Sequence, residues 1–80
     1  MHYTERLKEL RTENNISQQR IAEILNTTQQ QINKYENGKQ ELPLRRFIEL
    51  AVYYNVSLDY LAGMTEDKNG TWNKTTETKK

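Results

Sequence analysis

The sequence predicts an all-α fold, with five short helices forming one compact domain over residues 1–64 and a polar tail over residues 65–80. Eighty residues are enough for one domain and leave no room for a second. Apolar residues recur at helical spacing along residues 1–64, and no stretch there alternates between apolar and polar residues as a half-buried strand does. The tail has one large apolar side chain, Trp72, so we expect it to be flexible.

The first two helices are indicated by their apolar spacing and by the residues at their ends. Leu7 and Leu10 stand three residues apart among strong helix formers, which predicts a helix over residues 4–13. An Asn-Asn pair at 14–15 ends this helix. Ser17 is a favourable N-cap for a second helix, whose apolar residues are concentrated in 21–25.

A tight turn is expected between the second and third helices. Asn26 suits such a turn because Asn adopts the left-handed backbone conformation at low cost. Thr28 and Gln31 have the spacing of a capping box, which places the start of the third helix at Thr28. The Asn-Gly pair at 37–38 is a typical helix end. Residues 17–38 therefore predict a helix-turn-helix unit.

Two more helices complete the prediction. Pro43 fits the first turn of a fourth helix, where a missing backbone N–H costs nothing. This helix presents apolar residues at helical spacing, namely Leu44, Phe47, Leu50, Ala51 and Tyr54. Ser57 is the expected cap of a short fifth helix, which carries Leu58 and Leu61 and ends near Gly63.

The composition excludes several kinds of site. Seven residues are assigned to the core alone, namely Leu7, Leu10, Ile21, Leu25, Ile32, Leu50 and Leu61. A core this small is not expected to bind a small-molecule ligand. The chain has no Cys and its only His is His2, so no disulfide, metal site or cofactor is expected. Neither a membrane helix nor a signal peptide is evident, so we expect a cytoplasmic protein.

The third helix has two chemically different faces. On a helical wheel of about 100° per residue, Ile32 and Tyr35 share one side. The other side carries amides and one lysine, namely Gln29, Gln30, Asn33, Lys34 and Asn37. An α-helix fits the major groove of DNA, where one amide group can contact N7 and N6 of adenine together. This face is suited to reading base edges, and the alternative is an ordinary solvated helix surface.

The net charge of +1 does not by itself point to nucleic acid. Between residues 29 and 46, however, four basic residues stand against two acidic ones. The surface there is expected to be more positive than the chain as a whole, which favours a polyanionic partner.

Two segments, SQQRIAEILNTTQQQINKYENGK and LPLRRFIELAVYYNVSLDYLAG, resemble the helix-turn-helix family of lambdoid phage repressors, Cro and related XRE-type bacterial transcriptional regulators. The resemblance covers about residues 3–63. It implies a five-helix, lambda-repressor-like domain that binds palindromic double-stranded operator DNA as a homodimer, with the third helix as the recognition helix. Such a regulator would lie on the nucleoid when bound. One departure is Asn26, where the family usually has Gly.

The resemblance also assigns contacts to individual residues. Base-reading positions are matched by Gln29, Gln30 and Lys34, and the amide face adds Asn33 to them. Positions that contact phosphate are matched by Gln18, Asn37 and Lys39. Some relatives place an Arg on the loop into the fourth helix, where this chain has Leu44. Arg45 or Arg46 is the candidate substitute for that phosphate contact.

Two structural roles follow from the same resemblance. Arg11 and Glu36 match a pair that joins the first helix to the end of the third in some relatives, so Arg11 would brace the recognition helix. The alternative is two solvated surface charges. Near the last helix, where relatives dimerise, Tyr53, Tyr60 and Met64 are candidate interface residues or simply exposed side chains.

Other function classes are less well supported by these residues. A protein-interaction module on the same fold, such as an antitoxin-like partner-binding protein, would need an apolar or acidic face on the third helix, which this sequence lacks. An enzyme is disfavoured because no nucleophile and base stand at a catalytic spacing. RNA binding is disfavoured because no exposed aromatic residues alternate with the basic ones. The sequence therefore predicts a DNA-binding regulator, most simply a repressor.

Overall fold

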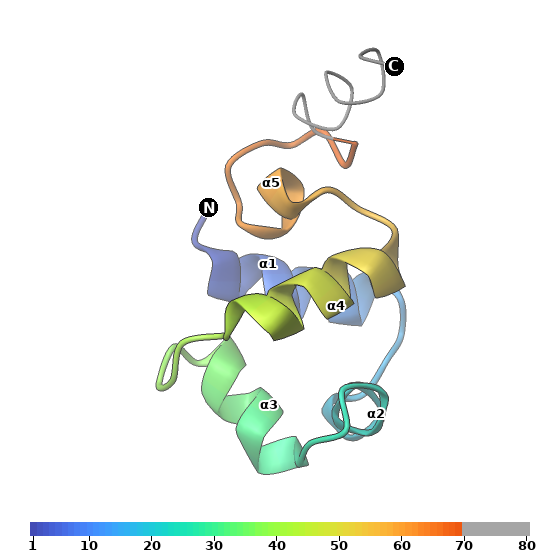
Figure 1. The fold of residues 1–80 in the computed structure, drawn as a ribbon, viewed down its shortest axis with the longest axis vertical. Coiled ribbons are helices and arrows are strands. Elements are labelled where there is room, and N and C mark those ends of the chain that lie inside the picture. Colours follow the sequence, from blue (N-terminus) through green and yellow to red (C-terminus); the bar gives the residue numbers. More distant parts are fainter. Residues whose placement is uncertain (70–80) are drawn as a thin grey trace.

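The computed structural model describes residues 1–69, which contain five helices and no strand. The helices are α1 (Tyr3–Glu13), α2 (Gln18–Ile24), α3 (Gln29–Glu36), α4 (Leu44–Tyr54) and α5 (Leu58–Leu61), as Figure 1 shows. Helix α1 contacts α3 and α5, α2 contacts α3, and α4 contacts α5. The all-α prediction is confirmed. Over the described part of the chain, no helix has both the length and the apolar character needed to cross a bilayer.

One apolar core contains residues from all five helices. It includes all seven residues that the sequence assigned to it, each at most 5% exposed. Burying a Leu or Ile side chain stabilises a fold by about 1.5–3 kcal/mol, so these contacts carry much of the stability. Ala22, which is 1% exposed, lets α2 and α3 pack closely.

Side-chain caps determine where the helices begin. The hydroxyls of Ser17, Thr28 and Ser57 each accept a hydrogen bond from the backbone N–H three residues later, at 3.0–3.1 Å. A cap of this kind contributes about 1 kcal/mol. At the first helix, Nδ1 of His2 accepts from the N–H of Thr4, so α1 begins one residue earlier than predicted.

The apolar residues of α4 lie partly in the core and partly on the surface. Leu50 and Ala51 are buried, and Phe47 and Tyr54 pack against the same core. Leu44, expected with them, is instead 70% exposed, because it stands in the first turn of the helix, which no other described residue covers. Pro43 precedes this turn as the N-cap residue rather than lying within it.

Tyr60 belongs to the core, so its prediction as a dimer-interface residue is wrong. Its side chain is 4% exposed, and the guanidinium carbon of Arg6 lies 3.7 Å from the centre of its ring. The Arg6 side chain is itself fully buried, and Nη2 donates to the carbonyl of Thr65 (3.3 Å) and to the Glu66 carboxylate (3.2 Å). The ring of Tyr60 therefore covers a buried cation and has no free face for a partner.

Residues 65–69 are held against the helices. In addition to the bonds from Arg6, the backbone N–H of Ser57 donates to the carbonyl of Lys68 at 2.7 Å. The predicted boundary after residue 64 therefore falls before residues that the domain still contacts. The rest of the predicted tail, residues 70–80 with Trp72, lies outside the described residues.

Candidate nucleic-acid interface

Helix α3 is anchored by its inner face. Ile32 and Tyr35 are 3% and 4% exposed, and both lie in the core. The helix ends at Glu36, and Gly38 with φ +73° lets the chain turn away while the N–H of Lys39 donates to the carbonyl of Lys34 at 2.9 Å. A residue with a Cβ adopts such a φ only with strain, so glycine suits this helix end.

The outer face of α3 carries the residues that the sequence predicts to read bases. The side chains of Gln29, Gln30, Asn33 and Lys34 are all exposed. Gln18 from α2 and Lys39 from the loop after α3 lie beside them, and these six residues line one open hollow on the surface. Four amide groups and two ammonium groups are thus brought together.

The turn between α2 and α3 has no glycine. Asn26 adopts the left-handed conformation at φ +60°, as predicted. Its backbone N–H donates to the carbonyl of Glu23 at 3.1 Å, and the next N–H, of Thr27, donates to Ala22 at 2.8 Å. These bonds satisfy carbonyls at the end of α2 that have no partner within the helix. The turn of the predicted helix-turn-helix unit therefore forms with Asn at this position.

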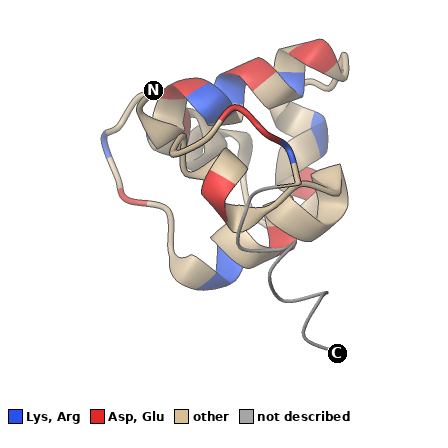
Figure 2. Ribbon diagram, turned by 90° about the horizontal axis from the view of Figure 1, so that it is seen from above, with Lys and Arg blue, Asp and Glu red and all other residues tan. Residues whose placement is uncertain are grey.

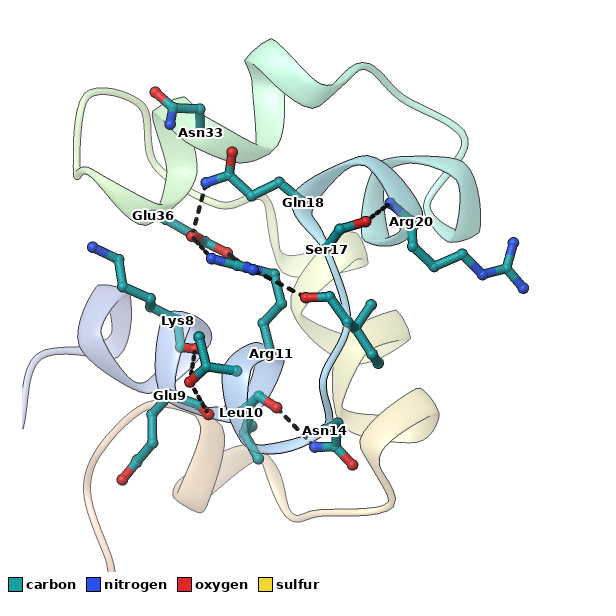
Figure 3. A network of polar contacts seen from close by, with 12 residues as sticks. Lys8, Glu9, Leu10, Arg11, Asn14, Ser17, Gln18, Arg20, Asn33 and Glu36 are labelled. Atoms are coloured by element: carbon teal, nitrogen blue, oxygen red, sulfur yellow. Dashed lines mark hydrogen bonds and ion pairs between the residues drawn. The ribbon is translucent and has the colours of Figure 1, made fainter.

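An ion pair connects α1 to the end of α3. Arg11 donates from Nε to Oε2 of Glu36 at 2.7 Å and from Nη2 to Oε1 at 3.2 Å, as Figure 3 shows. The two side chains are only 16% and 4% exposed. The guanidinium also donates to the carbonyl of Ile16 at 3.0 Å. The predicted pair is present, and the alternative of two solvated charges is wrong.

Gln18 joins this network from the first position of α2. Its Nε2 donates to Oε1 of Glu36 at 3.0 Å (Figure 3). The carboxylate of Glu36 therefore accepts three hydrogen bonds from two side chains, which compensates its burial. A side chain predicted to contact phosphate is thus oriented by the residue that closes α3. The sequence did not reveal this link.

Two other predicted contact residues have partners within the chain. Nδ2 of Asn37 donates to Oδ1 of Asn33 at 3.0 Å. Nη1 of Arg46 donates to the carbonyl of Leu25 at 2.8 Å and so fastens α4 to the C-cap of α2. Arg45, in contrast, is exposed. Of the two arginines proposed for phosphate, Arg45 is the one whose side chain has no internal role among residues 1–69.

Tyr54 lies next to the ion pair and has a shifted pKa. The pKa of its hydroxyl is raised from 10.0 to about 12, mainly by burial and also by the nearby Tyr53 and Glu36, while Arg11 acts to lower it. Tyr54 and Glu36 line the same small cavity in the core. The phenol therefore stays neutral beside the carboxylate at any physiological pH.

Charge is mixed on most of the described surface. Figure 2 shows acidic and basic residues alternating along α1, in keeping with a net charge of +1 for the whole chain. Helix α3 carries only Lys34 and the internally paired Glu36 as charged residues. The exposed face of α3 therefore consists mainly of amides, with a small positive excess.

Helix α3 has a buried inner face and an exposed amide face, and a short turn joins it to α2. These features define a helix-turn-helix protein. The family model described as "Helix-turn-helix" matches residues 7–61. The chain belongs to this family.

Relatives and a solved structure agree with this assignment. The "SPbeta prophage-derived uncharacterized HTH-type transcriptional regulator YonR" of Bacillus subtilis (strain 168) is 44% identical over 59 residues, which cover 74% of this chain and 55% of that protein. The "Uncharacterized HTH-type transcriptional regulator YobD" of the same organism is 32% identical over 65 residues, covering 81% and 58%. The chain thus spans little more than half the length of these relatives.

The fold is also shared with a transcriptional regulator from Listeria innocua known from its crystal structure. The TM-score is 0.76 at 27% identity, over 98% of this chain and 70% of that one. The family and its named relatives are transcriptional regulators rather than enzymes, in agreement with the prediction from the sequence.

Proposed function

We propose that this chain represses transcription by binding a palindromic operator as a homodimer, with α3 in the major groove of each half-site. The observation that carries the proposal is the exposure of Gln29, Gln30, Asn33 and Lys34 on a helix whose opposite face is fixed in the core. Membership of the helix-turn-helix family and the names of the relatives support it.

Base reading is assigned to the outer face of α3. Gln29 and Gln30 have no side-chain hydrogen bond within residues 1–69, so each amide can donate and accept at a base edge. An amide placed in this way pairs with N6 and N7 of adenine, whereas Lys34 would donate to guanine. Asn33 shares its oxygen with Asn37, which leaves its Nδ2 to donate to a base acceptor.

Phosphate contacts would set the orientation of the domain on the duplex. Gln18 uses one Nε2 proton for Glu36 and has a second for a phosphate oxygen. Asn37 and Lys39 follow directly after the recognition helix and would supply two further phosphate contacts. Arg46 would hold α4 on α2 rather than contact DNA.

Selection of bound sites from random duplex DNA, followed by sequencing, tests this proposal. The expected result is an enriched palindrome whose half-sites are centred about 34 Å apart, one helical turn of DNA. A double variant, Gln29→Ala with Gln30→Ala, keeps the buried face of α3 and serves as the matched control, which should lose the enrichment. The proposal fails if the wild-type chain enriches no sequence at low ionic strength.

A further inference from the structure

Three apolar side chains on α4 form an exposed line. Leu44 is 70% exposed, Ile48 45% and Val52 74%. They are spaced four residues apart, so they follow one another along the same side of the helix. Leu58, at the start of α5, adds a fourth exposed apolar side chain at 38%. These four residues are called the α4 patch below.

A groove runs beside this line, between the second half of α4 and the start of α5. Its walls include Ile48, Val52, Val56 and Leu58, and its floor includes the buried Ala51. Within the described residues, no side chain fills this groove. A hydrophobic side chain from another molecule could therefore be buried there without displacing any part of this domain.

Opposite charges lie along one edge of the patch. On a helical wheel, Arg45 and Glu49 fall at about 60° and 100° from Ile48, on the same side. Both are exposed, and neither forms an ion pair within residues 1–69. The edge therefore presents one positive and one negative charge, separated by one turn of helix.

We propose that the α4 patch binds a second copy of this chain, with the two α4 helices packed antiparallel about a twofold axis at Ile48. Leu44 and Val52 lie four residues on either side of Ile48, so the axis brings each Leu44 level with the partner's Val52. Leu44 then enters the groove beside the partner's Val52. The same patch thus supplies both the projecting side chain and its receptor, as a twofold interface requires.

The charges on the edge favour a second copy over an unrelated partner. In an antiparallel pair, equivalent edges of the two helices face each other. Measured along the helix axis, Arg45 then lies within two residues, or about 3 Å, of the partner's Glu49. The twofold symmetry forms the same pair a second time with the two chains exchanged. Any parallel arrangement would lose this match.

The size of the patch indicates a weak dimer. A standard interface buries about 800 Å² per partner over 20 or more residues, and four apolar side chains with two ion pairs fall below that size. We expect the free chain to be in a monomer–dimer equilibrium that duplex DNA shifts towards the dimer. Only this last consequence rests on the proposed function; the pairing itself does not.

Cysteine crosslinking tests the position of the twofold axis, since the chain contains no Cys of its own. In Ile48→Cys the two thiols would meet at the twofold axis. The axes of packed helices lie about 8–10 Å apart, and Cα atoms that face each other across the contact are closer than the axes, within the limit of about 7 Å that a disulfide needs. In Val52→Cys the two thiols would lie about 12 Å apart along the axis. We expect a crosslinked dimer from Ile48→Cys, none from Val52→Cys alone, and a mixed dimer when Leu44→Cys and Val52→Cys are combined.

Glu13→Cys is the control for random collision, because Glu13 is exposed at the end of α1 and lies outside the patch. All variants are oxidised with and without duplex DNA, and circular dichroism confirms that each is folded. If Ile48→Cys crosslinks no more than Glu13→Cys under both conditions, the proposed interface is wrong.

A charge exchange gives a second, independent measurement. Arg45→Glu and Glu49→Arg should each weaken self-association, measured by sedimentation equilibrium without DNA, because like charges would then face each other. The double exchange should restore association to within a few-fold of the wild-type constant. If the double exchange associates as weakly as the single ones, the antiparallel pairing is overturned.

These experiments separate the interface from the proposed function. Crosslinking of Ile48→Cys together with failure of the wild-type chain to bind any duplex would retain the interface and reject the function. Enrichment of an operator without the crosslink would retain the function and reject the interface.

Discussion

The guanidinium of Arg11, on α1, and the carboxylate of Glu36, at the last residue of α3, meet through two hydrogen bonds of 2.7 and 3.2 Å. The two residues are 25 positions apart in the chain, and Glu36 also accepts from Gln18 on α2. This contact therefore fixes three helices relative to one another at the C-terminal end of α3.

Replacing Arg11 by Ala should lower the free energy of unfolding by about 3–5 kcal/mol, the usual loss when one partner of a buried pair is removed. The carboxylate of Glu36 would keep only its bond from Gln18. Urea unfolding followed by circular dichroism measures the change. Arg20→Ala is the matched control, since its pair with Glu23 is 64% and 55% exposed and should contribute at most about 1 kcal/mol. Equal losses in the two variants would show that the Arg11 pair is not a brace.

Gln29→Ala should weaken binding to the selected operator by about 1–3 kcal/mol and relax the preference at one base pair. The side chain is exposed, so the fold should be unchanged. Fluorescence anisotropy on operators altered at single positions measures both effects. An equal loss on every operator would mean that Gln29 does not read a base.

Lys39→Ala should weaken binding to all sequences alike and reduce the slope of log K against log salt by about one unit. The reason is that a phosphate contact releases a counterion but carries no sequence information. Titration of specific and random duplexes over a range of salt concentrations measures the slope. A slope equal to that of the wild-type chain would remove Lys39 from the interface.

Asn26→Ala should destabilise the domain by about 1–2 kcal/mol, whereas Asn26→Gly should be tolerated. Asn26 has φ +60°, a conformation that costs a residue with an ordinary side chain about that amount and costs Gly little. Thermal unfolding of the two variants makes the comparison, with the Gly variant as control. Equal stability of both would show that backbone strain at this turn is unimportant.

Stability should fall between about pH 10 and pH 12, and Tyr54→Phe should reduce that fall. The pKa of Tyr54 is raised from 10.0 to about 12 in the folded chain, so the unfolded chain loses this proton first as the pH rises. The contribution of Tyr54 to stability is complete below pH 10 and is lost as the pH rises through its pKa of about 12 in the folded chain. Urea unfolding of both chains across this range measures it, and identical pH slopes would contradict it.

Much of the fold could be predicted because local signals agreed with one another. The caps Ser17, Thr28 and Ser57, and the turn residue Asn26, all act on their near neighbours in the chain. The seven core residues follow from helical spacing alone. The exposed face of α3 could be predicted for the same reason, since Ile32 and Tyr35 fix which side of that helix faces inward.

The missed features depend on contacts between distant residues. Burial of Tyr60 requires Arg6, 54 positions away, and a guanidinium stacked on a ring has no spacing signature. The bonds from Arg46 to Leu25 and from Gln18 to Glu36 are equally non-local. The line of Leu44, Ile48 and Val52 could have been detected from its regular four-residue spacing. The same helix carries a second apolar set, however, and the sequence alone does not tell which set faces the core.

The bonds that hold residues 65–69 have a practical consequence for biophysical work. Arg6 and Ser57 fix this segment at the end of the molecule opposite α3 (Figure 1). A dye attached through Asn69→Cys, in a chain with no other thiol, would tumble rigidly with the domain and stand well clear of a duplex docked on α3. Its rotational diffusion would then report complex size faithfully, without the label disturbing the bound nucleic acid.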